Sequence, residues 1–245
     1  MSSTILLIAL SFALAGFVKG VIGLGLPTIS MGLLALVMPT PQAAAILVIP
    51  SIITNFWQMF SGPAFWEITR RLWPLLAGTC LGTWSVAGMM TSAPSSTSKV
   101  VLGLCIAGYG LLGLSAVRFH VTPRMERWLA FPVGAATGLL AAGTGVFVIP
   151  SVPYLQALEM GRDRLVQALA ISFTVSTLAL VANLVAGRIF TLEIAGLSVL
   201  ALIPALAGMA LGQVARTRMS EAAFRRVFFA SLVLLGAYIA WRAVA

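Results

Sequence analysis

The sequence predicts an all-α polytopic membrane protein, with about eight transmembrane segments arranged as two inverted repeats of four. The first observation is composition: of 245 residues, 60% are hydrophobic and 9% are charged, and the mean hydropathy is +1.05. A soluble domain carries about a quarter charged residues. The second observation is duplication: the segment LLAGTCLG, from Leu75 to Gly82, returns as ALAGMALG, from Ala205 to Gly212.

Each apolar run is a candidate segment, because a helix needs about 20 residues to cross a bilayer. The runs are residues 4–37, 43–61, 72–90, 100–117, 128–158, 165–187, 194–215 and 224–241, and the first and fifth are overlong. No polar stretch is long enough to fold separately. We therefore expect one membrane domain, 1–245, with repeat 1 at about 1–118 and repeat 2 at about 128–245.

The two halves align in order with small gaps. The glycines of the two overlong runs match as Gly23 with Gly143 and Gly25 with Gly145. Further matches are Gln42, Ala43 and Ala45 with Gln167, Ala168 and Ala170; Ser51 with Ser176; Gly62 and Phe65 with Gly187 and Phe190; and Pro74, Gly78 and Gly82 with Pro204, Gly208 and Gly212. The offset drifts only from 120 to 130 residues, which favours a true duplication over chance similarity.

The arginines and lysines predict the topology, because they accumulate in cytoplasmic loops. If each overlong run enters and leaves on one face as a broken hairpin, eleven charges share one side: Arg70, Arg71, Arg118, Arg124, Arg127, Arg162, Arg164, Arg216, Arg218, Arg225 and Arg226. Lys99, Arg188 and Arg242 take the other side. A single crossing per overlong run would instead divide these charges seven and seven. The hairpin topology inverts the second repeat and places both termini outside, whether the hairpin is re-entrant or a pair of short helices.

The break in the first overlong run lies between Lys19 and Pro27, and it contains Gly20, Gly23 and Gly25. Broken backbone at membrane depth persists only where protein or a water-filled cavity satisfies it. Half-helices that begin after such glycines would aim their backbone N–H groups at the midplane, which suits an anion. The alternative is that the glycines only allow close helix packing. The second break contains Gly143, Thr144 and Gly145, with Pro150 close behind.

Lys19 is the one charge well inside an apolar run, and it adjoins the first break. Charges inside the membrane are costly and usually functional. Beside half-helix N-termini, this cation would bind a carboxylate, sulfonate or sulfite group. The alternative is a lysine that snorkels to the interface from a short first helix.

Polar residues on the following segments are candidate hydrogen-bonding partners for the bound anion. We select Asn55 and the matched pair Gln42 and Gln167. The alternative role for such side chains is to join helices to each other or to bond back to their own backbone. The glycines four apart in LAGxxLG favour close helix packing, either within the chain or in a homodimer.

The sequence gives no reason to expect a cofactor, metal or nucleic acid. Cys80 and Cys105 lie in apolar runs, and the basic loops are explained by topology and lipid contact. The acidic residues and His120 lie in or beside loops, so no buried carboxylate is available as a proton relay. A loop acid, a titrating Lys19, or transport without protons all remain open as coupling schemes.

With the breaks and the duplication in view, the chain resembles the sulfite exporter TauE/SafE family of permeases. The resemblance lies in GFVKGVIGLGLPTIS near the first break and GLLAAGTGVFVIPSVPYLQAL near the second, and it extends over nearly the whole chain. It implies export of a sulfur-containing or organic anion, such as sulfite or sulfoacetate. By motif position, Gly23, Gly25, Gly143 and Gly145 carry over, with Lys19 as the adjoining cation.

We therefore expect a secondary transporter of a small anion in the bacterial inner membrane, with the substrate bound between the two repeats and alternating access. Apolar chains built from two copies of one unit are typical of such transporters. Two alternatives are a non-transporting membrane subunit and an intramembrane enzyme. The enzyme is disfavoured because it would need a nucleophile with a base, or clustered metal ligands, inside the membrane.

Overall fold

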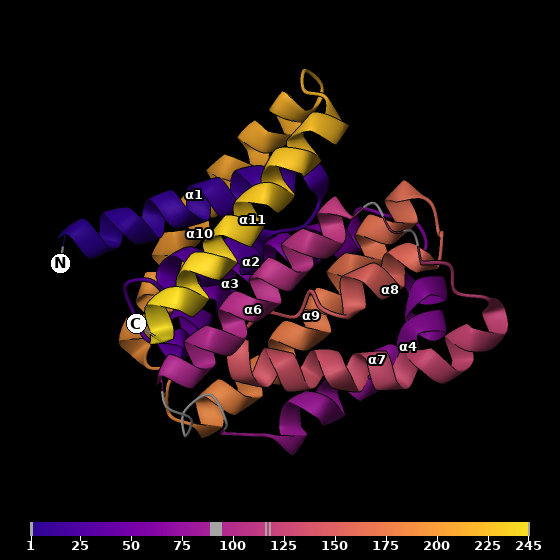
Figure 1. The fold of residues 1–245 in the computed structure, drawn as a ribbon, viewed down its shortest axis with the longest axis horizontal. Helices are drawn as coiled ribbons and strands as arrows, with labels where there is room; N and C mark the ends of the chain where they lie inside the picture. The colour runs from indigo at the N-terminus through magenta and orange to yellow at the C-terminus, as the bar shows by residue number, and fades with distance from the viewer. Residues whose placement is uncertain (1, 89–94, 116, 118, 245) are drawn as a thin grey trace.

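A computed structural model describes residues 2–88, 95–115, 117 and 119–244. These residues form a bundle of ten α-helices (Figure 1). In chain order the helices are α1 (Ser2–Ile22), α2 (Leu26–Leu34), α3 (Thr40–Phe60), α4 (Phe65–Ser85), α6 (Ser95–Leu114), α7 (Pro123–Thr144), α8 (Ser151–Ala157), α9 (Arg162–Ala186), α10 (Leu192–Arg216) and α11 (Glu221–Val244). The prediction of an all-α polytopic membrane protein is confirmed.

Six of the described helices are long and apolar enough to cross a membrane: α1, α3, α6, α9, α10 and α11. The other two long helices, α4 and α7, have 21 and 22 residues, which is similar to the length of α1. Each carries an acidic residue in its first turn, Glu67 in α4 and Glu126 in α7, and arginines nearby. Their composition is therefore less apolar than that of the six, although their length of about 31–33 Å suits a crossing.

Both overlong runs are broken, as predicted. Residues 4–37 form α1 and α2, and residues 128–158 form α7 and α8. The chain turns at glycines with positive φ, 81° at Gly23, 108° at Gly25 and 71° at Gly145, a conformation that residues with a Cβ rarely adopt. In each case a helix of full crossing length precedes one of 9 or 7 residues, so neither run is a pair of equal short helices.

Glycines join the long helices in pairs, and Figure 1 shows α1 along α10, α4 along α7 and α6 along α11. A Cβ on Gly208 or Gly212 would collide with the backbone oxygens of Ala13 or Phe17 in α1. On α4, a Cβ on Gly78 would likewise meet the oxygen of Phe131 in α7. The prediction that the LAGxxLG copies allow close helix packing is confirmed. Because these faces are used within the chain, they give no support to a homodimer.

Helices α3 and α9 form the buried centre. They pack against each other, and α10 and α4 cover them. The Ser51 hydroxyl lies 3.2 Å from that of Thr177, which joins the two helices directly. The surrounding helices carry outward-facing apolar side chains that include Trp73, Leu104, Leu211 and Trp241.

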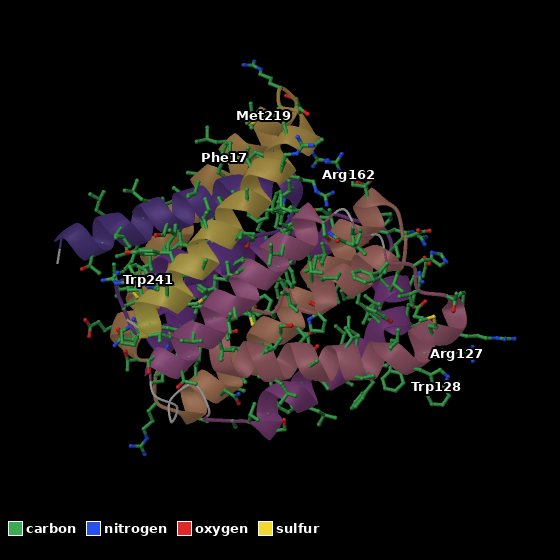
Figure 2. The ribbon with its side chains drawn as sticks, in the orientation of Figure 1. Phe17, Arg127, Trp128, Arg162, Met219 and Trp241 are labelled. Carbon is green, nitrogen blue, oxygen red and sulfur yellow. The ribbon has the colours of Figure 1, made fainter. Side chains whose placement is uncertain are left out.

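The described arginines of the predicted cytoplasmic loops lie near the start of α4, α7, α9 and α11 and at the end of α10, and this side of the bundle is here called the basic end. Arg71 forms a two-point ion pair with Glu126, at 2.6 and 2.8 Å, and Arg164 forms another with Glu67, at 2.8 and 2.9 Å. These pairs connect α4 to α7 and to α9. Figure 2 shows Arg162 and Met219 far from Trp241, which lies near the opposite end. Arg118, which the charge count includes, lies outside the described residues.

Candidate functional site

Lys19 is buried in the bundle. It lies in the last turn of α1, its side chain is 2% exposed, and its Nζ donates a 3.0 Å hydrogen bond to Thr54 Oγ1. Nζ also donates to Asn55 Oδ1. The snorkelling alternative is wrong, because the ammonium group turns inward to α3 rather than outward to the interface. Lys19 and Asn55, selected separately from the sequence, are therefore brought into direct contact.

Hydrogen bonds extend from Lys19 to the centre of the bundle. Asn55 Nδ2 donates to Ser51 Oγ at 3.2 Å, and Ser51 in turn contacts Thr177 of α9. Thr54 Oγ1 also donates to the carbonyl oxygen of Pro50, at 2.6 Å. All of these side chains are buried. The network holds Thr54 and Asn55 with their oxygens toward the ammonium group.

A cavity of about 370 Å³ opens from Lys19 to the basic end. Its charged lining residues are Lys19, Arg162, Asp163 and Arg216. Lys19 is buried, whereas Arg162 and Arg216 are exposed, so the cation of α1 lies at the floor and the arginines lie at the rim. The remaining lining residues are Gly20, Gly23, Trp57, Gln58, Ser61, Gly62, Pro63, Val166 and Gln213. Three cations against one carboxylate make the cavity attractive to an anion.

The first glycine break shapes this cavity through Gly20 and Gly23. Gly23 turns the chain, and its carbonyl oxygen accepts a 3.5 Å hydrogen bond from Gln58 Nε2. Gly25 caps α2 but lies against Val18 and Phe228. The cavity lining includes Gly20 and Gly23 but no residue of α2. Gly20 and Gly23 have no side chains, and this leaves room for the cavity to reach Lys19. The backbone N–H groups at the start of α2, which were expected to face the anion, do not line the cavity.

The second break lies elsewhere. Gly145 contacts Met31 and Ala44, the latter near the start of α3, whereas Gly23 contacts Gln58 near the end of α3. The contact positions Ala44 and Gln58 are fourteen residues apart in α3, about 21 Å along the helix axis. The expectation that the two breaks face one anion between them is wrong in this structure. The cause is that each break follows a full-length helix and so lies toward one end of the bundle.

Thr144 and Gly143 have local roles in the second break. Thr144 Oγ1 donates to the carbonyl oxygen of Leu140 at 2.6 Å and accepts from the backbone N–H of Val146 at 3.1 Å. Gly143 lies buried in the last turn of α7. These contacts close the end of α7, and they place neither residue in the Lys19 cavity.

The matched glutamines have different surroundings. Gln167 is 1% exposed, and its Nε2 donates to the carbonyl oxygens of Met59 and Gly62, at 2.8 and 2.7 Å. Its Oε1 accepts from the backbone N–H of Ala64 at 3.2 Å. Gln167 thus holds the connection between α3 and α4 that forms one wall of the cavity. Gln42 is exposed in the first turn of α3, at the end away from Lys19.

Sequence reasoning missed Arg162, Arg216 and Gln213 as cavity residues. The two arginines were assigned to topology alone. Their positions at the start of α9 and the end of α10 give no sign that both approach Lys19 of α1. Gln58 lies on the same helix as Asn55, and no local signal in the sequence singles it out. Only the packing of α1, α3, α9 and α10 brings these residues together.

A bundle of apolar helices that encloses a buried cation beneath a basic cavity is characteristic of a membrane transporter. The chain belongs to the sulfite exporter TauE/SafE family, whose model matches residues 8–239. It is therefore a multi-pass membrane protein of a transporter family and not an enzyme. No curated protein and no solved structure matches the chain.

Proposed function

We propose that this protein exports a small anion, sulfite or an organosulfonate or other organic acid, and that Lys19 binds it. The observation that carries this proposal is the buried ammonium group at the floor of the basic cavity. Among the described residues, the acidic side chains pair with Arg71, His120 and Arg164, and none pairs with Lys19. An ammonium group held away from water without a negative partner is costly, so a bound anion would supply the missing charge.

The substrate would approach past Arg216 and Arg162 and would be held by Lys19 with neutral donors nearby. Gln58 and Ser61 line the cavity and offer an amide and a hydroxyl. Thr54 and Asn55 act on the substrate through Lys19, because their oxygens already accept from its Nζ. Of the predicted site residues, the proposal keeps Lys19, Gly23 and Asn55 at the site and treats Gln167 as support for its wall.

Two inverted repeats account for the helix pairing. In this arrangement α1 is equivalent to α7, α3 to α9, α4 to α10, and α6 to α11. The contact of α1 with α10 is then equivalent to that of α7 with α4, and the α3–α9 and α6–α11 contacts each join a helix to its own equivalent. The glycines agree: Gly16 and Gly20 of α1 meet α10, and Gly134 and Gly138 of α7 meet α4. Under this equivalence α1 and α7 run in opposite directions, and in Figure 1 α1 starts at the left while α7 starts at the right.

A difference between the two short helices α2 and α8, which are equivalent in this arrangement, supports alternating access. Helix α2 packs against α6 and α11, with Gly32 against Leu235 and Ile106. Helix α8 stands apart from the same pair across a second cavity lined by residues of α6, α8 and α11. We infer that the return step moves the α6–α11 pair from α2 toward α8. The structure would then be the state open to the basic end, which the positive-inside rule assigns to the cytoplasm, with both termini outside.

The test is thermal stability of the purified protein in detergent with sulfite, sulfate, sulfoacetate, taurine and small carboxylates. A ligand of the folded state raises its apparent stability by mass action. We expect one class of anion to raise the melting temperature of the wild-type protein and of Lys99→Ala, which loses the same charge outside the cavity. Lys19→Ala should show no rise. Equal rises in both variants would overturn the assignment of the site.

A further inference from the structure

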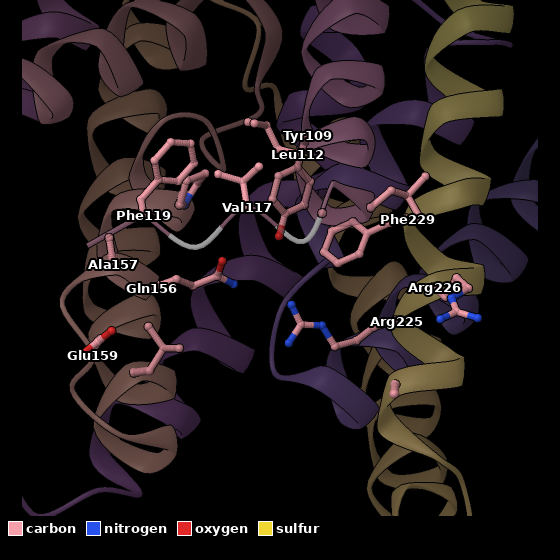
Figure 3. A pocket seen from close by; sticks show the side chains of 15 residues that line it. Tyr109, Leu112, Val117, Phe119, Gln156, Ala157, Glu159, Arg225, Arg226 and Phe229 are labelled. Carbon is pink, nitrogen blue, oxygen red and sulfur yellow. The ribbon is translucent and has the colours of Figure 1, made fainter. Parts of the chain in front are cut away.

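The second cavity, of about 680 Å³, lies at the basic end between α6, α8 and α11 (Figure 3). It is separate from the Lys19 cavity, because the two share no lining residue. One part of its wall is apolar and includes Leu112, Leu165 and Phe229. Another part carries the guanidinium groups of Arg225 and Arg226 and the amide of Gln156. The cavity is thus amphipathic.

One polar group of this cavity, the hydroxyl of Tyr109, has no hydrogen-bond partner in the described part of the chain. Tyr109 is 2% exposed, and its hydroxyl makes no hydrogen bond. Figure 3 shows this hydroxyl and the Arg225 guanidinium pointing into the same space, with the Gln156 amide across from them. A buried hydroxyl without a partner costs about 1–3 kcal/mol, so a ligand that accepts a hydrogen bond here is favoured.

Packing fixes these groups in place. The Tyr109 ring meets Phe229 edge-on at 5.4 Å between centroids, and the Arg225 guanidinium carbon lies 5.8 Å from the centroid of the same Phe229 ring. Among the side chains that the structure describes, no carboxylate forms an ion pair with Arg225. The one acidic lining residue, Glu159, lies in Figure 3 on the far side from Arg225, and its carboxylate is 3.4 Å from His120 Nδ1.

We propose that this cavity binds the phosphate head group of an anionic membrane lipid while the protein is open to the basic end, before the return step brings α6 and α11 toward α8. Arg225 supplies the charge, the Tyr109 hydroxyl and the Gln156 amide donate hydrogen bonds to the phosphate oxygens, and the acyl chain packs on the apolar wall. Basic pockets between transmembrane helices on the cytoplasmic side are suited to such head groups. A free oxyanion shares the head-group chemistry but leaves the apolar wall uncovered.

The test compares three probes on the purified full-length protein in detergent: short-chain phosphatidylglycerol, phosphatidylcholine of the same chain length, and inorganic phosphate. Affinity is measured from the rise in melting temperature with probe concentration. Phosphatidylglycerol should bind most tightly. Arg225→Gln should weaken it roughly tenfold, and Tyr109→Phe, which keeps the ring packing, should weaken it several-fold.

Arg218→Gln is the matched control, because it removes an arginine of the same end that does not line the cavity. It should bind phosphatidylglycerol as the wild-type protein does. Equal losses in Arg218→Gln and Arg225→Gln would overturn the site in favour of general surface attraction. Equal binding of phosphatidylcholine would overturn recognition of the anionic head group. Equal binding of inorganic phosphate would overturn the lipid as the ligand.

Discussion

The hydroxyl of Ser198 donates a 2.7 Å hydrogen bond to the carbonyl oxygen of Ile46 on another helix. Ile46 lies four residues before Pro50, inside α3, and proline has no N–H to give to that oxygen. Ser198 of α10 therefore supplies the donor that α3 lacks. Its Oγ also accepts from the backbone N–H of Ile49 at 3.1 Å. One buried serine thus repairs the helix that carries Thr54 and Asn55.

The first prediction concerns this repair. Ser198→Ala should lower the free energy of unfolding by about 1–3 kcal/mol, because it leaves buried backbone groups unpaired. In a Pro50→Ala background the new N–H at position 50 can bond to Ile46, so the same change should cost less. The measurement is a double-mutant cycle on melting temperature in detergent. Equal costs in both backgrounds would contradict the repair.

Local sequence signals predicted the fold well. Each of the eight apolar runs contains at least one described helix, and both overlong runs are broken at their glycines. These features depend on residues close together in the chain, and a glycine-rich interruption is visible without knowledge of tertiary contacts. Lys19 could be singled out for the same reason, since a cation inside an apolar run is unusual wherever the run packs.

The rest of the site depends on packing between distant segments. Arg162 and Arg216 reach the cavity because α9 and α10 end beside α1, which no local pattern encodes. Gln42 and Gln167 match in the sequence alignment, yet one is exposed and the other is buried with three hydrogen bonds. The two glycine breaks were expected to face the same anion because their motifs match. Matching motifs show that two segments are similar in sequence, but they do not show that the segments lie close together in the fold.

The second prediction tests the glycine contacts. Gly208→Ala should destabilise the protein by at least about 1–3 kcal/mol, because its methyl group would collide with the backbone oxygen of Ala13 and force α10 from α1. The control is Gly196→Ala on the same helix, where an added Cβ meets nothing within 4 Å. That change should be neutral or stabilising by up to about 1 kcal/mol. Melting curves of the two variants give the comparison, and similar values would contradict the close contact.

The third prediction concerns orientation in the membrane. Gln42 and Ser61 lie exposed at opposite ends of α3. In a background with Cys80 and Cys105 replaced by alanine, an impermeant maleimide added to intact cells should label Gln42→Cys and spare Ser61→Cys. Inverted vesicles should show the reverse, because Ser61 lines the cavity at the basic end. The opposite pattern in both preparations would contradict the assignment of the basic end to the cytoplasm.

The fourth prediction separates attraction at the rim from binding at the floor. Arg216→Gln should raise KM for the transported anion several-fold and weaken its salt dependence, with kcat nearly unchanged, because a rim charge acts mainly on approach. Arg218→Gln, two residues along and outside the cavity lining, should leave both parameters unchanged. Initial rates in proteoliposomes at several salt concentrations provide the measurement. A loss confined to kcat would contradict a role in approach.

The last prediction places a permanent negative charge beside Lys19. Asn55 Oδ1 accepts from the Lys19 ammonium group, so Asn55→Asp puts a carboxylate of the same size at hydrogen-bonding distance from a buried cation. The new pair would satisfy the charge that the substrate is proposed to satisfy. Anion-dependent stabilisation should therefore disappear and transport should fall at least tenfold, while the melting temperature without anion holds or rises.

Gln42→Glu makes the same charge change at the other end of α3, exposed and outside the cavity, and should leave transport intact. If Asn55→Asp transported the anion at the wild-type rate, Lys19 would not be the group that binds it; if it failed together with a fall in melting temperature, Asn55 would be needed for folding and not for the balance of charge.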